Sequence, residues 1–207
     1  EVELREAERN IAYCDSMLPI KEAEAAELTK GFTFEKDSVY EEVGNYIWKQ
    51  QTIERNVQRC YIRCGVSEKG EMYLASVYFG GHPISHTGIR LSLKDGQFAT
   101  TASIPFDGGL NYRFKDMGNT TEVVTYKGEN GMEAIKFIYV NQKERIKVEY
   151  TGGKPYVIYI ADGDKRAIVA TYDLATVLSD VENMRTLKAK SEKKIAYLKA
   201  KLTDDGE

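Results

Sequence analysis

The hydrophobic pattern of this chain changes its period twice, and this change limits the folds that are open to it. Between residues 45 and 161 apolar and polar residues alternate, for example in residues 89–93 and 145–150. Alternation is typical of strands that have one face in the core and one in water. On both sides of this region apolar residues recur at intervals of seven, which is typical of helices. The pattern therefore predicts an α+β protein with an antiparallel β-domain between two terminal helices.

The predicted β-domain, residues 45–161, has room for about eight to ten strands. Turn signals that contain glycine separate the strands, at residues 69–70, 80–81, 95–96, 107–109, 118–119, 130–131 and 152–153. We find no helix-length interruption. The strands are therefore expected to form a meander that is curled or closed into a barrel-like sheet, since curling limits exposed edges. Residues 72–79 and 156–160 are apolar on both faces, which predicts central strands or strands covered by a helix.

Residues 1–44 are predicted to form an N-terminal helical arm and an irregular connector. Apolar side chains recur every seven residues in the arm, at Leu4, Ile11, Leu18 and Ala25. Pro19 predicts a kink or a break, because proline lacks the backbone donor and crowds the preceding turn.

Residues 162–207 are predicted to form one long C-terminal helix, with Leu174, Val181, Ile195 and Leu202 on one apolar line. A helix of this extent is roughly 60 Å long, so part of it must project from the β-domain or find a partner. We expect that partner to be the N-terminal helix, packed antiparallel as a coiled-coil arm. Charge supports this pairing. Residues 1–18 hold five acidic and two basic side chains, whereas residues 185–202 hold seven basic and one acidic.

Composition and motifs exclude several classes of protein. The net charge of −3 gives no basic field, so nucleic acid is not an expected partner. The apolar runs are short, and none approaches the ~20 residues of a membrane-spanning helix. No phosphate loop, dinucleotide fingerprint or Gly-x-Ser-x-Gly motif occurs. We therefore expect no cofactor, and we favour a non-catalytic protein over an enzyme.

The three cysteines form no disulfide framework in the sequence. If Cys60 and Cys64 lie in one strand, four steps separate them by roughly 13 Å. A disulfide requires Cα atoms within about 7 Å, so we expect both thiols to be free.

Residues 105–116 combine a tight glycine turn with aromatic, basic and acidic side chains. This mixture is typical of the rim of a ligand site, and the candidate ligand-binding residues are Asp107, Tyr112, Arg113 and Asp116. The alternative, which we favour, is a hairpin turn followed by an edge strand whose basic side chains face water. Turns account for each glycine in this segment.

His82 and His86 are the two histidines of the chain and the candidates for a metal site. A spacing of four residues brings two imidazole rings together on a helix, but the glycines and the proline of residues 80–83 are incompatible with a helix. A loop between two strands is therefore favoured over metal binding. Ser85 and His86 are neighbours, which places them on opposite faces of an extended chain and does not favour a catalytic pair.

Four stretches resemble one known group of proteins. They are AYCDS at residues 12–16, GNYI at 44–47, MYLASVY at 72–78 and YRFKD at 112–116. They are similar to uncharacterised cell-envelope proteins of Bacteroidetes, many of them described as lipoproteins. The resemblance implies an exported protein, periplasmic or tethered to the outer membrane through a lipid anchor upstream of residue 1. It implies no activity. The first residue is Glu rather than Met, which we interpret as a sign of a processed chain. The alternative location is the cytoplasm.

Three hypotheses about function follow. The leading one is a non-catalytic exported cell-envelope protein that binds another protein or a surface component, because the terminal helices project and catalytic motifs are absent. The second is a small-molecule or glycan binder that uses the mouth of the β-domain, which a deep pocket lined by tyrosines would favour. The third is a hydrolase with an unrecognised site, which two carboxyl groups facing one another in a cleft would favour.

Overall fold

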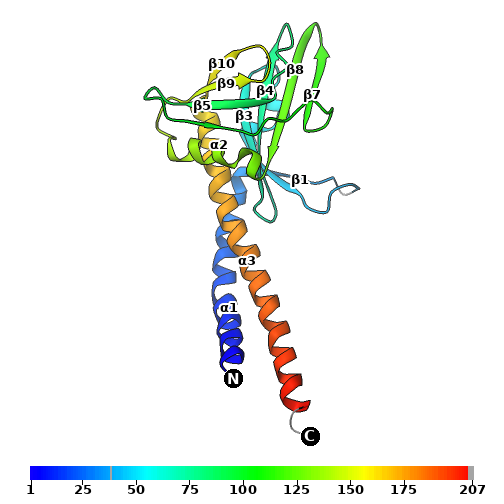
Figure 1. The fold of residues 1–207 in the computed structure, drawn as a ribbon, viewed down its shortest axis with the longest axis vertical. Coiled ribbons are helices and arrows are strands. Elements are labelled where there is room, and N and C mark those ends of the chain that lie inside the picture. Colours follow the sequence, from blue (N-terminus) through cyan, green and yellow to red (C-terminus); the bar gives the residue numbers. More distant parts are fainter. Residues whose placement is uncertain (38, 205–207) are drawn as a thin grey trace.

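The computed structural model describes residues 1–37 and 39–204, and it has an α+β architecture of a head and a projecting arm (Figure 1). The helices are α1 (Val2–Leu28), α2 (Glu129–Val140) and α3 (Asp162–Asp204). Sheet A has the strand order β1-β2-β3-β4-β8-β7, with β1 (Phe32–Glu35), β2 (Asn45–Trp48), β3 (Tyr61–Ser67), β4 (Met72–Gly80), β7 (Asn111–Asp116) and β8 (Asn119–Lys127). Sheet B has the order β10-β9-β5-β6, with β5 (Gly88–Ser92), β6 (Phe98–Thr100), β9 (Lys147–Thr151) and β10 (Tyr156–Tyr159).

The predicted fold class, the antiparallel pairing and the flanking helices are confirmed. The described strands do not close into a barrel, however, and they form two sheets. The chain leaves sheet A after β4, starts sheet B with β5 and β6, and returns to sheet A with β7 and β8. A second difference is α2, which lies inside the region where we expected strands alone. Its Ile, Phe, Tyr and Val side chains are typical of strands, but Ala134, Ile135 and Ile138 share one buried helical face.

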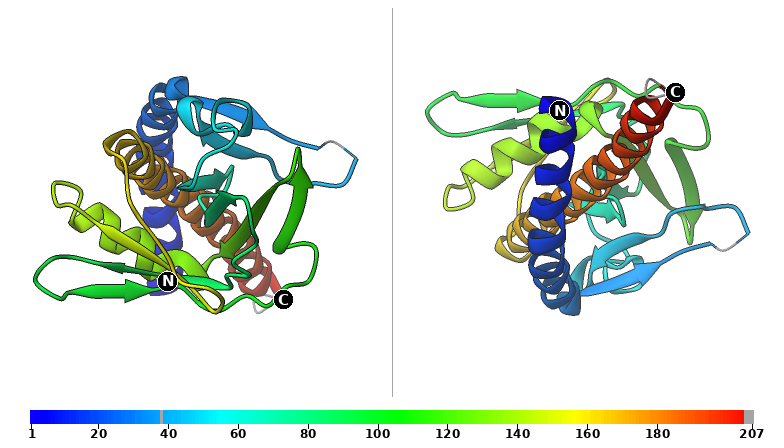
Figure 2. Two further views of the ribbon diagram at one scale, coloured as in Figure 1. Left: turned by 90° about the horizontal axis from the view of Figure 1, so that it is seen from above. Right: turned by 90° about the horizontal axis from the view of Figure 1, so that it is seen from below.

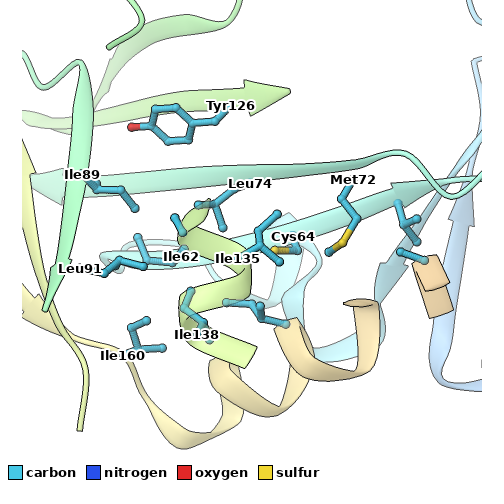
Figure 3. Close-up of a cluster of buried hydrophobic side chains, with 14 of the residues drawn as sticks. Ile62, Cys64, Met72, Leu74, Ile89, Leu91, Tyr126, Ile135, Ile138 and Ile160 are labelled. Atoms are coloured by element: carbon cyan, nitrogen blue, oxygen red, sulfur yellow. The ribbon is translucent and has the colours of Figure 1, made fainter. Parts of the chain in front are cut away.

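The hydrophobic core lies between the inner faces of the two sheets and the helices α2 and α3. Figure 3 shows this cluster, to which β3, β4, β5, β8, α2 and α3 all contribute side chains. Among the fully buried members are Ile62, Leu74, Leu91, Tyr126, Ile135, Ile138, Ile168 and Leu174. The interior of the head, over the described residues, is therefore filled by side chains.

One strand prediction and the prediction for the connector need correction. Residues 72–79 form a central strand as predicted, because β4 pairs with both β3 and β8. Residues 156–160 were predicted to be central or covered by a helix as well, but β10 is an edge strand and its side chains are largely exposed. The connector is not wholly irregular either, because residues 32–35 form β1 against β2. Short aromatic segments carry little periodicity, so the sequence does not separate edge from centre.

The arm consists of α1 packed antiparallel on α3, as the sequence predicts (Figure 1). The expected charge pairing occurs: Lys188 pairs with Asp15 at 2.6 Å, Arg185 with Glu22 at 3.0 Å and Lys194 with Glu3 at 3.8 Å. These pairs are largely exposed and each contributes only about 0 to 1 kcal/mol. Most of the stability comes from the apolar seam between the helices, whose buried members include Ala7, Cys14, Ala25, Val177 and Val181.

Pro19 does not break the first helix, which runs without interruption from Val2 to Leu28. The proline is exposed, so the carbonyl that loses its helical partner lies near the exposed face and can bind water. The contacts with α3 hold the helix together on both sides of the proline. Leu202, predicted on the seam, is 61% exposed, because Lys194 already lies opposite Glu3 and later residues of α3 extend past that point.

All three cysteines are free, as predicted. Cys14 is buried in the arm, where its thiol donates to the carbonyl oxygen of Met184 at 3.4 Å. Cys64 is buried in β3, and burial raises the pKa of its thiol. Cys60 is half-buried and accepts a hydrogen bond from the backbone N–H of Phe79.

Candidate functional site

The outer face of sheet A, opposite the core, carries the best candidate for a functional site. Side chains alternate along each strand, so the residues that flank those of the core point to this face. They form a small apolar cluster of Tyr61, Ala75, Val77 and Val123, with Tyr112 packed on its edge. The cluster contains no helical residue. The β1–β2 and β7–β8 hairpins diverge from the centre of the sheet, so that sheet A is strongly curved (Figure 2).

A cleft of about 200 Å³ opens on this face, and we call it the aromatic cleft. Its floor is formed by Tyr61, Val77 and Val123, which are 3 to 5% exposed. One wall comes from β7 and the other from residues 53–59. A concave, largely apolar surface with a few polar groups around it is typical of ligand sites.

Two aromatic rings form a flat platform on the β7 side of the cleft. Tyr112 and Phe114 occupy successive outward positions of this edge strand, and their rings are 6.3 Å apart with an interplanar angle of 17°. Phe114 is 49% exposed, although apolar rings of this size are usually buried. The platform therefore presents two nearly parallel ring faces beside the cleft.

The opposite wall is held in place by its own hydrogen bonds. The amide of Asn56 donates to the carbonyl oxygens of Gln50 and Thr52 at 2.8 and 2.7 Å, and it accepts from Arg59 at 2.8 Å. Arg59 also forms an ion pair with the buried carboxylate of Asp164 in the first turn of α3. These bonds fix the wall before any ligand arrives, which lowers the entropic cost of binding.

The same wall contains a residue in an unusual backbone conformation. Gln58 lines the cleft with a φ of 61°, in the left-handed region that non-glycine residues rarely adopt. Such conformations cost about 1 to 3 kcal/mol and are frequent at functional sites. The observation supports this wall as part of a site.

Arg63 on β3 is the second unusual group. It lines the aromatic cleft and also a neighbouring hollow on the same face, which Phe34, Asn45 and Tyr73 help to form. Its Nε is buried and has no hydrogen-bond partner among the described residues. Its Nη1 donates to the hydroxyl of Tyr61 at the long distance of 3.4 Å. A buried donor without an acceptor costs about 1 to 3 kcal/mol. Nε itself is closed to solvent, so a ligand would contact Arg63 through the partly exposed remainder of its side chain.

The pKa values of two tyrosines on this face reflect the positive charge of Arg63. Burial raises the pKa of Tyr73 to about 12, and the positive charge of Arg63 opposes this increase. Burial also raises the pKa of Tyr61, again opposed by Arg63. Both tyrosines therefore stay neutral at physiological pH and can donate hydrogen bonds from their hydroxyl groups.

The structure separates the four residues that the sequence proposed for ligand binding. Tyr112 and Asp116 line the aromatic cleft. Asp107 instead holds its own turn, since its Oδ1 accepts from the N–H groups of Gly109 and Asn111, and these bonds lower its pKa. Arg113 points to the other face of β7, where it donates to the Oγ of Ser85 at 3.0 Å.

Sequence reasoning did not find the other half of the cleft. Tyr61 and Arg63 were available as a signal, because an aromatic and a basic side chain alternate there with buried Ile62 and Cys64. Alternation assigns these residues to one face of a strand. It does not show that this face lies beside β7, which is distant in the sequence.

His82 and His86 do not come together as a metal site. His82 is exposed, and His86 is 1% exposed in the interior. No group of three or more metal-ligating side chains exists in residues 1–37 and 39–204. His86 instead belongs to a buried polar network.

This network has the connectivity of a hydrolase triad. His86 Nδ1 lies 2.9 Å from Glu122 Oε1, and His86 Nε2 lies 2.9 Å from Ser76 Oγ. With Glu122 ionised, Nδ1–H donates to the carboxylate, and Nε2 and the serine hydroxyl share a second hydrogen bond. Ser76 Oγ is also 2.8 Å from the hydroxyl of Tyr126. Ser76 is fully buried and lines no described pocket, so a substrate cannot reach it.

The network therefore has a structural role. The second oxygen of Glu122 accepts from the backbone N–H groups of Ile84 and Ser85 at 2.6 and 2.8 Å. Burial opposes the charged form, but the hydrogen bonds from His86 and from the backbone outweigh it and lower the pKa of Glu122 to about 2. The carboxylate thereby attaches the segment that enters sheet B to β8 of sheet A.

Comparisons with protein families, with curated proteins and with solved structures find no match for this chain. Over the described residues, no helix has the length and apolar character that a bilayer crossing requires. The function is therefore argued from the geometry of the aromatic cleft.

Proposed function

We propose that the protein is a non-catalytic binding protein and that its aromatic cleft binds a sugar ring of a glycan. The platform of Tyr112 and Phe114 carries this proposal. One face of a sugar ring consists of C–H groups and packs on the flat face of an aromatic side chain, whereas the hydroxyl groups at its edge need polar partners. Two nearly parallel rings beside a largely apolar cleft with polar groups around it satisfy both requirements.

Polar groups surround the platform where the hydroxyl groups of such a ring would lie. The cleft includes the amides, guanidinium groups, carboxylate and hydroxyl of Asn56, Gln58, Arg59, Arg63, Asp116 and Thr121. They provide both donors and acceptors, which a hydroxyl group uses at the same time.

The shape of the face supports a chain of several sugars rather than one small molecule. The aromatic cleft and the hollow beside Tyr73 share Arg63, so they are neighbours on the same face of sheet A. A glycan is the ligand of the second hypothesis from the sequence, which placed the site at the mouth of the β-domain rather than on the outer face of sheet A. A hydrolase of the two-carboxylate type is not supported, because Asp116 is the one acidic residue among the described residues that line the aromatic cleft.

Tyr112→Ala and Phe114→Ala are each expected to weaken glycan binding at least about tenfold, since each removes half of the platform. Binding is to be measured by a glycan array and then by calorimetry on the oligosaccharides that bind. Phe98→Ala is the matched control, because Phe98 is also an exposed ring on an edge strand and lies on sheet B. Equal binding by all three variants and the parent protein would contradict the proposal.

We also propose that the protein is exported and located in the cell envelope, with a lipid anchor upstream of residue 1. The resemblance of residues 12–16, 44–47, 72–78 and 112–116 to envelope proteins supports this location. Fractionation of cells that express the complete gene should recover the protein with the periplasm or the outer membrane. Recovery in the cytoplasmic fraction alone would contradict it.

A further inference from the structure

Arg63 differs from the other half-buried arginines of the head, Arg59 and Arg90, because it has no ion pair in the part of the chain that the structure describes. Arg59 is neutralised by Asp164, and Arg90 on sheet B is neutralised by Glu149 at 3.1 Å. Arg63 forms no ion pair within the described residues, although it is partly buried. A charged group in this position needs an opposite charge or water to stabilise it.

We infer that the ligand is an acidic glycan and that the guanidinium of Arg63 binds a carboxylate on one of its sugars. This inference rests on the proposed glycan-binding function and names the chemical class of the ligand. The geometry that carries it is a half-buried arginine without an ion pair among the described residues, on a side chain that lines both hollows.

A carboxylate fits this position better than a neutral hydroxyl group. The planar guanidinium presents parallel N–H donors, which match the two oxygens of a carboxylate and form charge-assisted bonds. Asp116 lines the same cleft, but no ion pair within 4.0 Å joins it to Arg63. The neighbouring hollow is also lined by Glu35, Asp37 and Glu41, and none of these carboxylates forms an ion pair with Arg63. The charge of Arg63 is therefore available to a carboxylate of a ligand.

The position of Arg63 also indicates which part of the ligand carries the charge. The platform lies on one side of Arg63, and the hollow with Phe34, Asn45 and Tyr73 lies on the other. A carboxylate held at Arg63 leaves one sugar on the platform and room for the chain to continue toward Tyr73. The recognised unit is thus an internal acidic sugar of a longer chain, of the uronic acid class.

The test uses the full chain and an array of neutral, uronic-acid-containing, sialylated and sulfated oligosaccharides. Binding should concentrate on members with a carboxylate. Methyl esterification of the uronic acid should weaken binding at least about tenfold, because it removes the charge and leaves the sugar ring unchanged. Arg63→Gln should cause the same loss with the free acid and no further loss with the ester. Arg90→Gln, on sheet B, should bind as the parent does.

The possible results separate the inference from the proposed function. If neutral oligosaccharides bind as tightly as acidic ones and still require Tyr112 and Phe114, the inference is wrong and the glycan-binding function stands. If sulfated members bind as well as carboxylated ones, the specificity is for negative charge and the carboxylate assignment is wrong. If no oligosaccharide binds, both are wrong. Thermal unfolding of Arg63→Gln, compared with the parent, shows whether a loss of binding reflects a loss of folding.

Discussion

Glu122→Gln is expected to lower the free energy of unfolding at neutral pH by about 3 to 5 kcal/mol. The carboxylate accepts hydrogen bonds from His86 and from three backbone N–H groups, at 2.6 to 3.0 Å. Glutamine replaces one acceptor oxygen with an NH₂ donor, which then faces buried donors. Several of the His86 and backbone N–H groups then lose their acceptor in a buried region.

The same site predicts how stability depends on pH. The pKa of Glu122 is lowered from 4.5 to about 2 in the folded protein. Its stabilising contribution is therefore complete above about pH 4.5, and it is lost as the pH falls toward 2. The parent protein should lose about 3 kcal/mol from this group over that interval, and the glutamine variant should not.

Chemical denaturation of both proteins across the acidic range measures these effects. Glu149→Gln is the control, since Glu149 is also paired with basic side chains but is 31% exposed and should cost less than about 1 kcal/mol. A glutamine variant at residue 122 that is as stable as the control would show that the buried network does not hold the two sheets together.

Val181→Asp is expected to separate the two helices of the arm. Val181 is 5% exposed on the seam between α1 and α3, and a carboxylate there would be buried without a partner. The cost is about 3 kcal/mol or more, which exceeds what the exposed ion pairs of the arm can offset. The arm should lose helicity while the head keeps its core, because that core is formed by the two sheets and their covering helices.

Circular dichroism and amide hydrogen exchange test this outcome. In the variant, α1 should lose protection along most of its length, and the strands of sheet A should remain protected. Asn183→Asp is the matched control, because it adds the same charge to the exposed side of α3 two residues away. Full protection of α1 in Val181→Asp would mean that the helices do not depend on one another.

The sequence was sufficient to predict that the two terminal helices pair antiparallel, because both the apolar spacing and the charges are local features of each helix. Apolar residues spaced by seven mark one face of each helix. The acidic start of the first helix and the basic end of the last helix attract one another only if the helices pack antiparallel. The same reasoning found the strand at residues 72–79. It missed α2, whose side chains are those of a strand, because local preference gives way to burial when a segment covers a sheet.

The candidate site was predicted only in part, because it depends on which strands become neighbours. Tyr112 and Asp116 stood out within one unusual segment. Tyr61 and Arg63 join them because β4 pairs with β3 on one side and with β8 on the other. That order arises because the chain forms β5 and β6 of sheet B between β4 and β7 of sheet A. No local sequence pattern predicts this change of sheet. The partnership of Ser76, His86 and Glu122 depends on the same change of sheet.

The antiparallel arm has a mechanical consequence. The first residues of α1 and the last described residues of α3 both lie at the end of the arm farthest from the head, where α3 extends past α1 (Figure 1). A force that draws these two ends apart would peel the seam open one layer of side chains at a time. A force between one of these ends and a ligand held by the head would load the whole seam lengthwise, so that many contacts must fail together. An arm of this kind resists tension along its axis much better than it resists separation of its two ends.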